Sequence, residues 1–351
     1  MNVVYSARYH IDIGLHVFPT TKYRLVHARL LETGVVEPSD VVEPTPASWD
    51  DLGLVHTPEY LAKMRDGAMS PEDVAQLELP WSREMVDGFR VMVGGTIQAA
   101  LIACGLEVGS LKSEVRIEPA SDFRLQTSNF RVCCHIGGGL HHAFANHGEG
   151  FCPFNDVAVA VRVLQSQGIE RAAIVDLDVH HGNGTSFIFN HGGAPSPPQT
   201  RSDRSSRAYQ AQDVGDPRVF TFSMHQQHNY PMWKPRGSLD VGLPDGTHDE
   251  TFLRELAAAL PQVMAHRPGC VFYLAGADPY EDDQLGGLRL TKDGLRRRDR
   301  AVISAVRDAG VPLVIVLAGG YARHVEDTVA IHAATIQEAA ALQRPRDSWT
   351  G

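Results

Sequence analysis

Three side chains of the kinds that bind divalent metals stand at alternate positions after a short apolar segment. The segment is residues 173–175, whose length and apolar character are typical of a strand buried on both faces. The side chains are those of Asp176, Asp178 and His180. Because side chains in a strand have a period of two, these three project from the same face for as long as the chain stays extended. Two carboxylates and an imidazole would pack poorly in a core, so their position at the end of a buried strand predicts a metal site.

An alternative is that these polar groups cap the edge of the sheet and contact solvent, which is the better interpretation of an isolated Asp-x-His pair. Here the fuller pattern Asp-x-Asp-x-His-His-Gly follows an apolar strand. Open parallel sheets bind ligands at the carboxyl ends of their strands, so we favour the metal site. Gly182 and Gly184 come next and predict a turn with a helix after it.

A second apolar segment also ends in a carboxylate. Asp278 follows YLAGA in the way that Asp178 follows AIVDL. Together with Asp178 and His180 it would supply three protein ligands and leave one coordination position open, which is typical of catalytic rather than structural zinc sites. Taken alone, Asp278 would also be explained as a helix N-cap before Pro279.

Paired histidines and a tyrosine follow glycines at two further strand ends. His141 and His142 come after Gly-Gly-Gly-Leu, and Tyr321 comes after two glycines. Alone, the histidines would be interpreted as a glycine turn with one hydrogen-bonded core histidine, and the tyrosine as a ring packed over the sheet with its hydroxyl in water. Beside a metal site, they are candidates for proton transfer and for a hydrogen bond to substrate.

Strand-like and helix-like segments alternate along the chain, which predicts an α/β fold with a parallel sheet covered by helices on both faces. The expected strands are residues 2–5, 41–42, 131–136, 173–175, 219–223, 270–275 and 312–317, and the expected helices include residues 22–31, 82–104, 157–167, 251–264, 290–306 and 325–342. Because no repeat or linker is evident, residues 1–351 are interpreted as one domain with loop insertions at 105–129 and 191–216. The second insertion is rich in Pro, Ser and Arg and is expected to be an exposed loop.

Composition argues against some ligand classes and leaves others open. The 351 residues are 43% hydrophobic and 21% charged, as in an ordinary globular protein. The formal net charge of −10 argues against direct binding of nucleic acid and leaves open a cationic substrate such as a polyamine. The five cysteines include no CxxC pair, and we expect no signal peptide and no segment of membrane-spanning length. These features predict a cytoplasmic protein with reduced thiols and no membrane partner, and they leave its oligomeric state open.

Six motifs occur in the order in which one known family has them: GGGLHHAF, GFCPFND, VDLDVHHGNGT, FSMH, AGADPYEDDQLGGLRLT and LAGGY. Each alone is weak, but the ordered set over residues 137–321 resembles the zinc-dependent histone deacetylase family, with its bacterial relatives the acetylpolyamine amidohydrolases and acetoin-utilisation proteins. HVFP and HTPEYL extend the resemblance toward the amino terminus. It implies a three-layer α/β/α arginase-like fold with one mainly parallel sheet of about eight strands.

The resemblance implies hydrolysis of the amide of an acylated amine, with acetyl-lysine in a peptide or protein as the expected substrate and zinc as the metal that activates water. The residues that match the family's zinc ligands are Asp178, His180 and Asp278. A structural potassium ion is expected near Asp176, Asp178, His180 and Ser223.

The same resemblance implies catalytic and substrate-binding roles for further residues. His141 and His142 match the paired histidines that handle the proton of the attacking water, and Asp176 matches the carboxylate behind the first of them. Tyr321 matches the hydroxyl that polarises the acyl carbonyl. The residues expected to contact substrate are Phe151, Gly150, Gly319 and, more loosely, Tyr230.

One position departs from some branches of the family. Position 183 is Asn rather than Asp, so His142 lacks an ionised partner there and is expected either to stay neutral more easily, as a general base should, or to be poorly oriented. Three rival functions remain open at this point. They are hydrolysis of acetylpolyamines or small metabolites, a two-manganese ureohydrolase, for which ligands are missing, and a catalytically silent binder of acyl-lysine.

Overall fold

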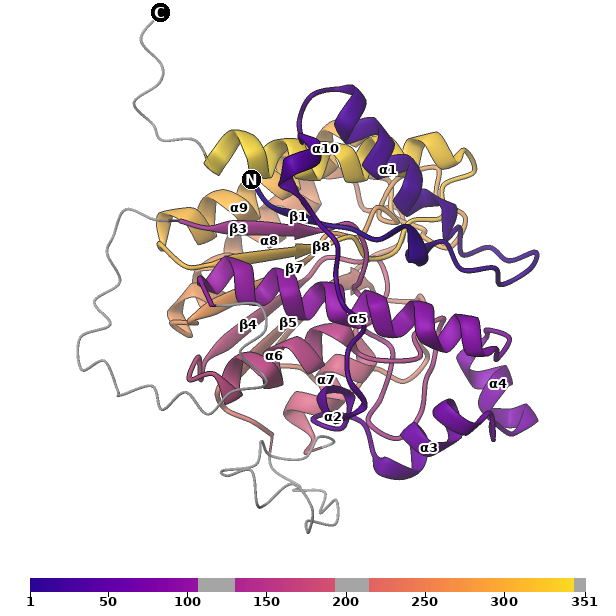
Figure 1. The fold of residues 1–351 in the computed structure, drawn as a ribbon. Coiled ribbons are helices and arrows are strands. Elements are labelled where there is room, and N and C mark those ends of the chain that lie inside the picture. Colours follow the sequence, from indigo (N-terminus) through magenta and orange to yellow (C-terminus); the bar gives the residue numbers. More distant parts are fainter. Residues whose placement is uncertain (107–129, 193–214, 344–351) are drawn as a thin grey trace, which may run out of the picture.

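Eight strands form one sheet in the computed structural model, which describes residues 1–106, 130–192 and 215–343 (Figure 1). The strands are all paired in parallel, in the order β2-β1-β3-β8-β7-β4-β5-β6. Their bounds are β1 Val3–Val4, β2 Val41–Val42, β3 Val132–His135, β4 Ala172–Asp176, β5 Val219–Gln226, β6 Leu239–Leu243, β7 Cys270–Leu274 and β8 Leu313–Val316. The expected insertions, residues 105–129 and 191–216, fall almost wholly outside the described residues.

Helices cover both faces of this sheet (Figure 1). Helix α5 packs against α6 on one face, and α1, α10, α9 and α8 pack side by side on the other. The α-helices are α1 Thr21–Glu32, α2 Trp49–Leu52, α3 Pro58–Asp66, α4 Pro71–Leu77, α5 Arg83–Cys104, α6 Asp156–Ser166, α7 Asn183–Asn190, α8 Asp249–Ala265, α9 Lys292–Asp308 and α10 Val325–Gln343. This arrangement confirms the expected three-layer α/β/α fold.

The central strands are buried throughout because they are continuous apolar segments. Every residue of β4 (AAIVD), β7 (CVFYL) and β8 (LVIV) is buried, as expected of parallel strands covered on both faces. Strand β6 (LDVGL) lies at the edge of the sheet and alternates between partly buried and exposed residues until Leu243. A short, partly exposed edge strand of this kind gives a weak sequence signal, and the sequence analysis did not predict it.

Helix α5 corrects one expectation from the sequence. With 22 residues it is long enough, and by composition apolar enough, to cross a membrane, although no segment was expected to reach that length. In the fold α5 packs against β3, β8 and α6, and 83% of its most apolar window is buried. Ser82 accepts a hydrogen bond from the Met85 N–H at its start, and Gly105 ends it in the left-handed region with φ 71°. We therefore interpret α5 as a core helix.

Candidate active site

The loops that follow the strands gather at one edge of the sheet because the strands are parallel. The loop after β4 carries Asp178 and His180, and the loop after the neighbouring β7 carries Asp278. The loops after β3 and β8 carry the paired histidines and the tyrosine. The fold thus brings the chemically notable residues of four separate segments to one place, as their positions in the sequence predicted.

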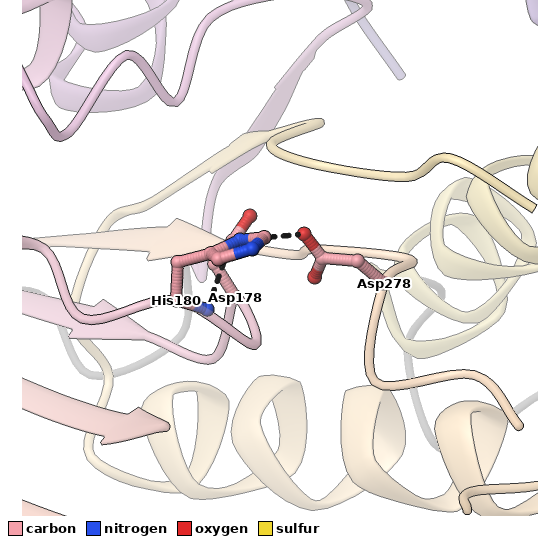
Figure 2. A group of neighbouring side chains, drawn as sticks. All are labelled: Asp178, His180 and Asp278. Carbon is pink, nitrogen blue, oxygen red and sulfur yellow. Dashed lines mark hydrogen bonds and ion pairs between the residues drawn. The ribbon is translucent and has the colours of Figure 1, made fainter. Parts of the chain in front are cut away.

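Asp178, His180 and Asp278 form a buried cluster whose potential ligand atoms lie within 4.8 Å of one another (Figure 2). Nδ1 of His180 lies 3.0 Å from Oδ1 of Asp178 and 3.3 Å from Oδ2 of Asp278. This Oδ2 atom is buried and has no hydrogen-bond partner among the described residues. A buried carboxylate oxygen that accepts no hydrogen bond is expected to bind a partner such as a cation, so the cluster fits a divalent metal.

Turns rather than an extended strand orient these ligands. The strand β4 ends at Asp176, so the expected strand periodicity stops there. Oδ1 of Asp176 accepts a hydrogen bond from the Asp178 N–H (3.2 Å), and Oδ1 of Asp178 accepts one from the His180 N–H (3.0 Å). Two further oxygens are held by backbone groups, with Gly319 N–H donating to Oδ2 of Asp178 and Val179 N–H donating to Oδ1 of Asp278. The carboxylates are therefore preorganised by the loops around them.

The electrostatics of the cluster favour a cation. Burial alone lowers the pKa of His180, but the hydrogen bond to Asp178 and the ion pair with Asp278 outweigh it and raise the pKa to about 10. Burial and the neighbouring charge of Asp178 raise the pKa of Asp278 to about 7. Two buried carboxylates thus share a single imidazole, and a divalent cation would compensate their negative charge more fully than a proton does.

A buried arginine supports the two loops that carry the cluster. Nη1 of Arg298, in α9, donates to the carbonyl oxygen of Gly276 (2.6 Å) and points toward that of Leu177 (3.4 Å). Its guanidinium pairs with Asp299, which also accepts a hydrogen bond from the Tyr273 hydroxyl. Arg298 is fully buried. It therefore ties the loop after β4 to the loop after β7, a contact that no local sequence pattern indicated.

The paired histidines have different electrostatic surroundings. Nδ1 of His141 lies 2.7 Å from Oδ2 of Asp176, and burial is outweighed by the charges of Asp176 and Asp178, which raise the pKa of His141 to about 9. Burial, then the neighbouring His141 and His180, hold the pKa of His142 well below its usual value. The two Nε2 atoms lie 3.1 Å apart. One imidazole therefore favours a proton and its neighbour favours the neutral form.

The partner of His142 is Asn183, as expected from the sequence, but a carboxylate lies behind it. Nδ1 of His142 is 2.7 Å from Oδ1 of Asn183, and Nδ2 of Asn183 donates to Oε1 of Glu149 over 2.7 Å. The hydroxyl of Tyr230 donates to the same oxygen over 2.9 Å. The sequence analysis missed Glu149, whose only local signal is a charged residue between two glycines.

A narrow cavity of about 30 Å³ opens beside the cluster and is lined by residues from several loops. Of the residues expected to contact substrate, Phe151, Gly150 and Gly319 line it, together with Phe18 and Tyr23, which the sequence analysis did not single out. The rings of Phe18 and Phe151 stack with centroids 6.1 Å apart. These walls give the cavity an apolar character close to the metal-binding residues.

Tyr230 was expected, more loosely than the others, to contact substrate. It is not among the residues that line the cavity. Its ring meets that of His142 edge to face, with centroids 4.9 Å apart. A Cβ at Gly150 would lie 2.8 Å from Cδ2 of His142 and 3.0 Å from Cε1 of Tyr230, and the backbone there has φ 53°. Only glycine allows the chain to pass this close to both rings.

Tyr321 completes the cavity after β8 and is 9% exposed. Its backbone N–H donates to Oδ2 of Asp283 over 2.7 Å, which fixes the chain at this residue. Burial, followed by the charges of Asp178 and Asp278, raises the pKa of Tyr321 well above its usual value. The hydroxyl therefore keeps its proton and can donate a hydrogen bond.

A model of the histone deacetylase domain matches residues 16–336 of the chain. The chain belongs to the histone deacetylase family. An uncharacterized protein of Picosynechococcus sp. is 39% identical over 333 residues, which cover 94% of this chain and 95% of that protein. Histone deacetylase 2 of Arabidopsis thaliana is 29% identical over 349 residues, which cover 94% of this chain and 78% of the plant protein. A probable deacetylase of Archaeoglobus fulgidus is 29% identical over 320 residues, 86% of this chain and 76% of that protein.

Solved structures of family members share the fold. A histone deacetylase homologue complexed with SAHA has a TM-score of 0.72 at 21% identity, covering 97% of this chain and 84% of that one. The HD domain of HDA15 has a TM-score of 0.67 at 22% identity, covering 95% of this chain and 87% of that one. The domain match over residues 16–336 confirms the resemblance to the histone deacetylase family, and membership places the protein among deacetylase-type amide hydrolases.

Proposed function

We propose that the protein is a zinc-dependent deacetylase that hydrolyses the amide of acetyl-lysine in a peptide or protein. The observation that carries this proposal is the buried cluster of Asp178, His180 and Asp278 at one end of a partly apolar cavity. Two carboxylates and one imidazole are a ligand set that suits zinc and leaves a coordination position for water and substrate. The unpartnered Oδ2 atom of Asp278 supports the same assignment.

A bound zinc ion would supply Lewis acidity and lower the pKa of water in the site. His142 is held neutral, so its Nε2 is available to accept a proton from the attacking water and to return it to the leaving amine. His141 is hydrogen-bonded through Nδ1 to Asp176, which favours its protonated form, and in that form it would stabilise the negative charge that develops nearby. Tyr321 is proposed to donate its hydroxyl proton in a hydrogen bond to the acyl oxygen.

The cavity supports an acylated lysine as the substrate. Phe18 and Phe151 provide aromatic walls for the methylene stem, and acylation removes the charge that such walls would disfavour. A structural potassium ion is also proposed near Ser223, which is in register with Asp176 across β4 and β5. A cytoplasmic location and a single domain over residues 1–351 remain predictions from the sequence.

Metal analysis combined with an activity assay tests the proposal. Purified protein is measured for zinc and manganese by mass spectrometry and assayed with a fluorogenic acetyl-lysine peptide. We expect one zinc per chain and turnover, and we expect Asp178→Asn to lose both while the melting temperature changes little. Acetyl-lysine peptides, longer acyl-lysines and acetylated polyamines are then compared by kcat/KM.

Other outcomes would replace the proposal. Two manganese ions per chain would favour a ureohydrolase, and tight binding of acetyl-lysine without turnover would favour a silent binder. A kcat/KM that is highest for acetylated polyamines would keep the chemistry and change the substrate. An Asp178→Asn protein that holds a full zinc equivalent and keeps wild-type activity would refute the ligand assignment.

A further inference from the structure

The two histidines of the site have chemically different partners on Nδ1, the ring nitrogen opposite the pair. For His141 the partner is the carboxylate of Asp176, at 2.7 Å. A carboxylate only accepts, so it keeps a proton on Nδ1 of His141. For His142 the partner is the amide of Asn183, also at 2.7 Å. An amide has one accepting end and one donating end, so Asn183 alone is compatible with either tautomer of His142.

The orientation of the Asn183 amide is decided by Glu149. Nδ2 of Asn183 lies 2.7 Å from Oε1 of Glu149. Since an ionised carboxylate has no proton to donate, only the NH₂ end of the amide can face it. The carbonyl end of Asn183 must then face His142 and accept the proton of Nδ1. This leaves Nε2 of His142 without a proton, on the side of the ring that faces His141.

We propose that Glu149 is a positioning residue that, through Asn183, fixes the tautomer in which His142 can accept a proton at Nε2. The inference rests on the proposed function, in which His142 takes up the proton of the attacking water. Glu149 acts through the amide and needs no contact with the substrate.

Glu149 is itself held from several sides. The hydroxyl of Tyr230 donates to Oε1 over 2.9 Å, and Nε2 of Gln76 and Nε2 of His147 each lie 3.4 Å from Oε2. The side chain is 17% exposed. Burial raises the pKa of Glu149, but the hydrogen bonds that it accepts, led by the one from His147, outweigh burial and lower it. The carboxylate is therefore ionised at neutral pH and can act only as an acceptor.

Glu149→Gln tests the inference because it replaces the acceptor with an amide of the same shape. The two amides can then rotate together, so that the NH₂ group of Asn183 faces His142 and the imidazole proton moves to Nε2. We expect kcat on an acetyl-lysine peptide to fall on the order of 10–100-fold, while KM stays within about threefold. Gln76→Ala is the matched control, because it removes a contact to the other carboxylate oxygen and leaves the one that faces Asn183. It should keep wild-type kinetics.

Asn183→Asp provides a rescue that a purely structural role would not give. In the Glu149→Gln background it places a carboxylate directly beside His142, and we expect kcat to recover in part, about tenfold, because the carboxylate again keeps the proton on Nδ1 although it also raises the pKa of His142. In the wild-type background the same substitution should lower kcat, because two carboxylates facing each other at hydrogen-bond distance cannot both be ionised. The effect of Asn183→Asp is thus expected to change sign with residue 149.

The tautomer is measured directly by ¹⁵N NMR of zinc-loaded protein with labelled histidine, the resonances being assigned by their loss in His142→Ala. We expect Nδ1–H in the wild type and in Gln76→Ala, and Nε2–H or a mixture in Glu149→Gln. An unchanged tautomer in Glu149→Gln would overturn the inference. So would a rise in KM with kcat unchanged, which would show that Glu149 acts by holding Tyr230. If the wild type hydrolyses no acylated amine, the proposed function fails, and the spectra still decide the role of Glu149.

Discussion

Gly319→Ala is expected to abolish zinc binding without unfolding the protein. A Cβ at Gly319 would lie 2.0 Å from Oδ2 of Asp278 and 2.5 Å from Oδ2 of Asp178. Ordinary van der Waals contact begins at 3.4 Å, so the Asp278 oxygen would have to move by 3.4 − 2.0 = 1.4 Å. Zinc sites accept deviations of only about 0.2 Å in their ligand distances. The added methyl group therefore cannot coexist with the ligand positions of this structure.

The size of the effect follows from this displacement. Disturbing the groups around a metal ligand costs about 10–100-fold in metal affinity. Because Gly319→Ala displaces two proposed ligands themselves, we expect the zinc affinity to fall by more than about 100-fold. Overpacking costs about 1–3 kcal/mol, which would lower the melting temperature by only a few degrees in a chain of 351 residues. Metal loss without unfolding is thus the expected signature.

Zinc affinity is measured by competition with a chelator of known affinity, and the melting temperature by circular dichroism. Gly242→Ala, in β6, is the matched control, because its Cβ would meet only side-chain atoms of Gln227, at 3.3 Å. It should keep wild-type zinc affinity. If Gly319→Ala binds zinc as tightly as the wild type, the backbone at this position does not confine Asp278 and the steric reasoning fails.

Three further predictions concern the tyrosine, the paired histidines and the buried arginine. Tyr321→Phe should lower kcat on the order of 10²–10³-fold with zinc content unchanged, because it removes one donor to the developing oxyanion; a kcat within about threefold of wild type would exclude this role. His142→Ala should cost more turnover than His141→Ala at matched zinc occupancy, and equal or reversed losses would contradict the assignment of the base. Arg298→Met should lower the free energy of unfolding, measured with urea, by about 3–5 kcal/mol because it leaves the buried Asp299 without its partner; an unchanged value would show that the pair contributes nothing to stability.

The positions of the cluster residues could be predicted from the sequence because they depend on local patterns. Asp178 and Asp278 each follow a continuous apolar segment, and parallel topology then places both at the same edge of the sheet. The central strands were predicted for the same reason. The edge strand β6 was missed because its alternating, partly exposed residues resemble a loop.

Residues whose effect depends on distant partners could not be predicted in this way. Glu149 acquires its significance from Asn183, 34 positions away, and Arg298 from carbonyl groups at Leu177 and Gly276, 121 and 22 positions away. A backbone carbonyl carries no side-chain signature, and a lone glutamate between glycines is compatible with many roles. Such contacts become visible only when the three-dimensional arrangement of the loops is known.

The position of β8 in the sheet has a consequence for biosynthesis. Although β8 is the last strand in chain order, it lies between β3 and β7 and joins β2-β1-β3 to β7-β4-β5-β6. Until Val316 leaves the ribosome, these two half-sheets therefore have no hydrogen-bonded connection, and each presents an unpaired apolar strand that can pair with another chain. The edge of β3 stays unpaired from residue 135 until residue 316 has been made, a span of 316 − 135 = 181 residues, so premature termination is expected to yield aggregates rather than a folded fragment.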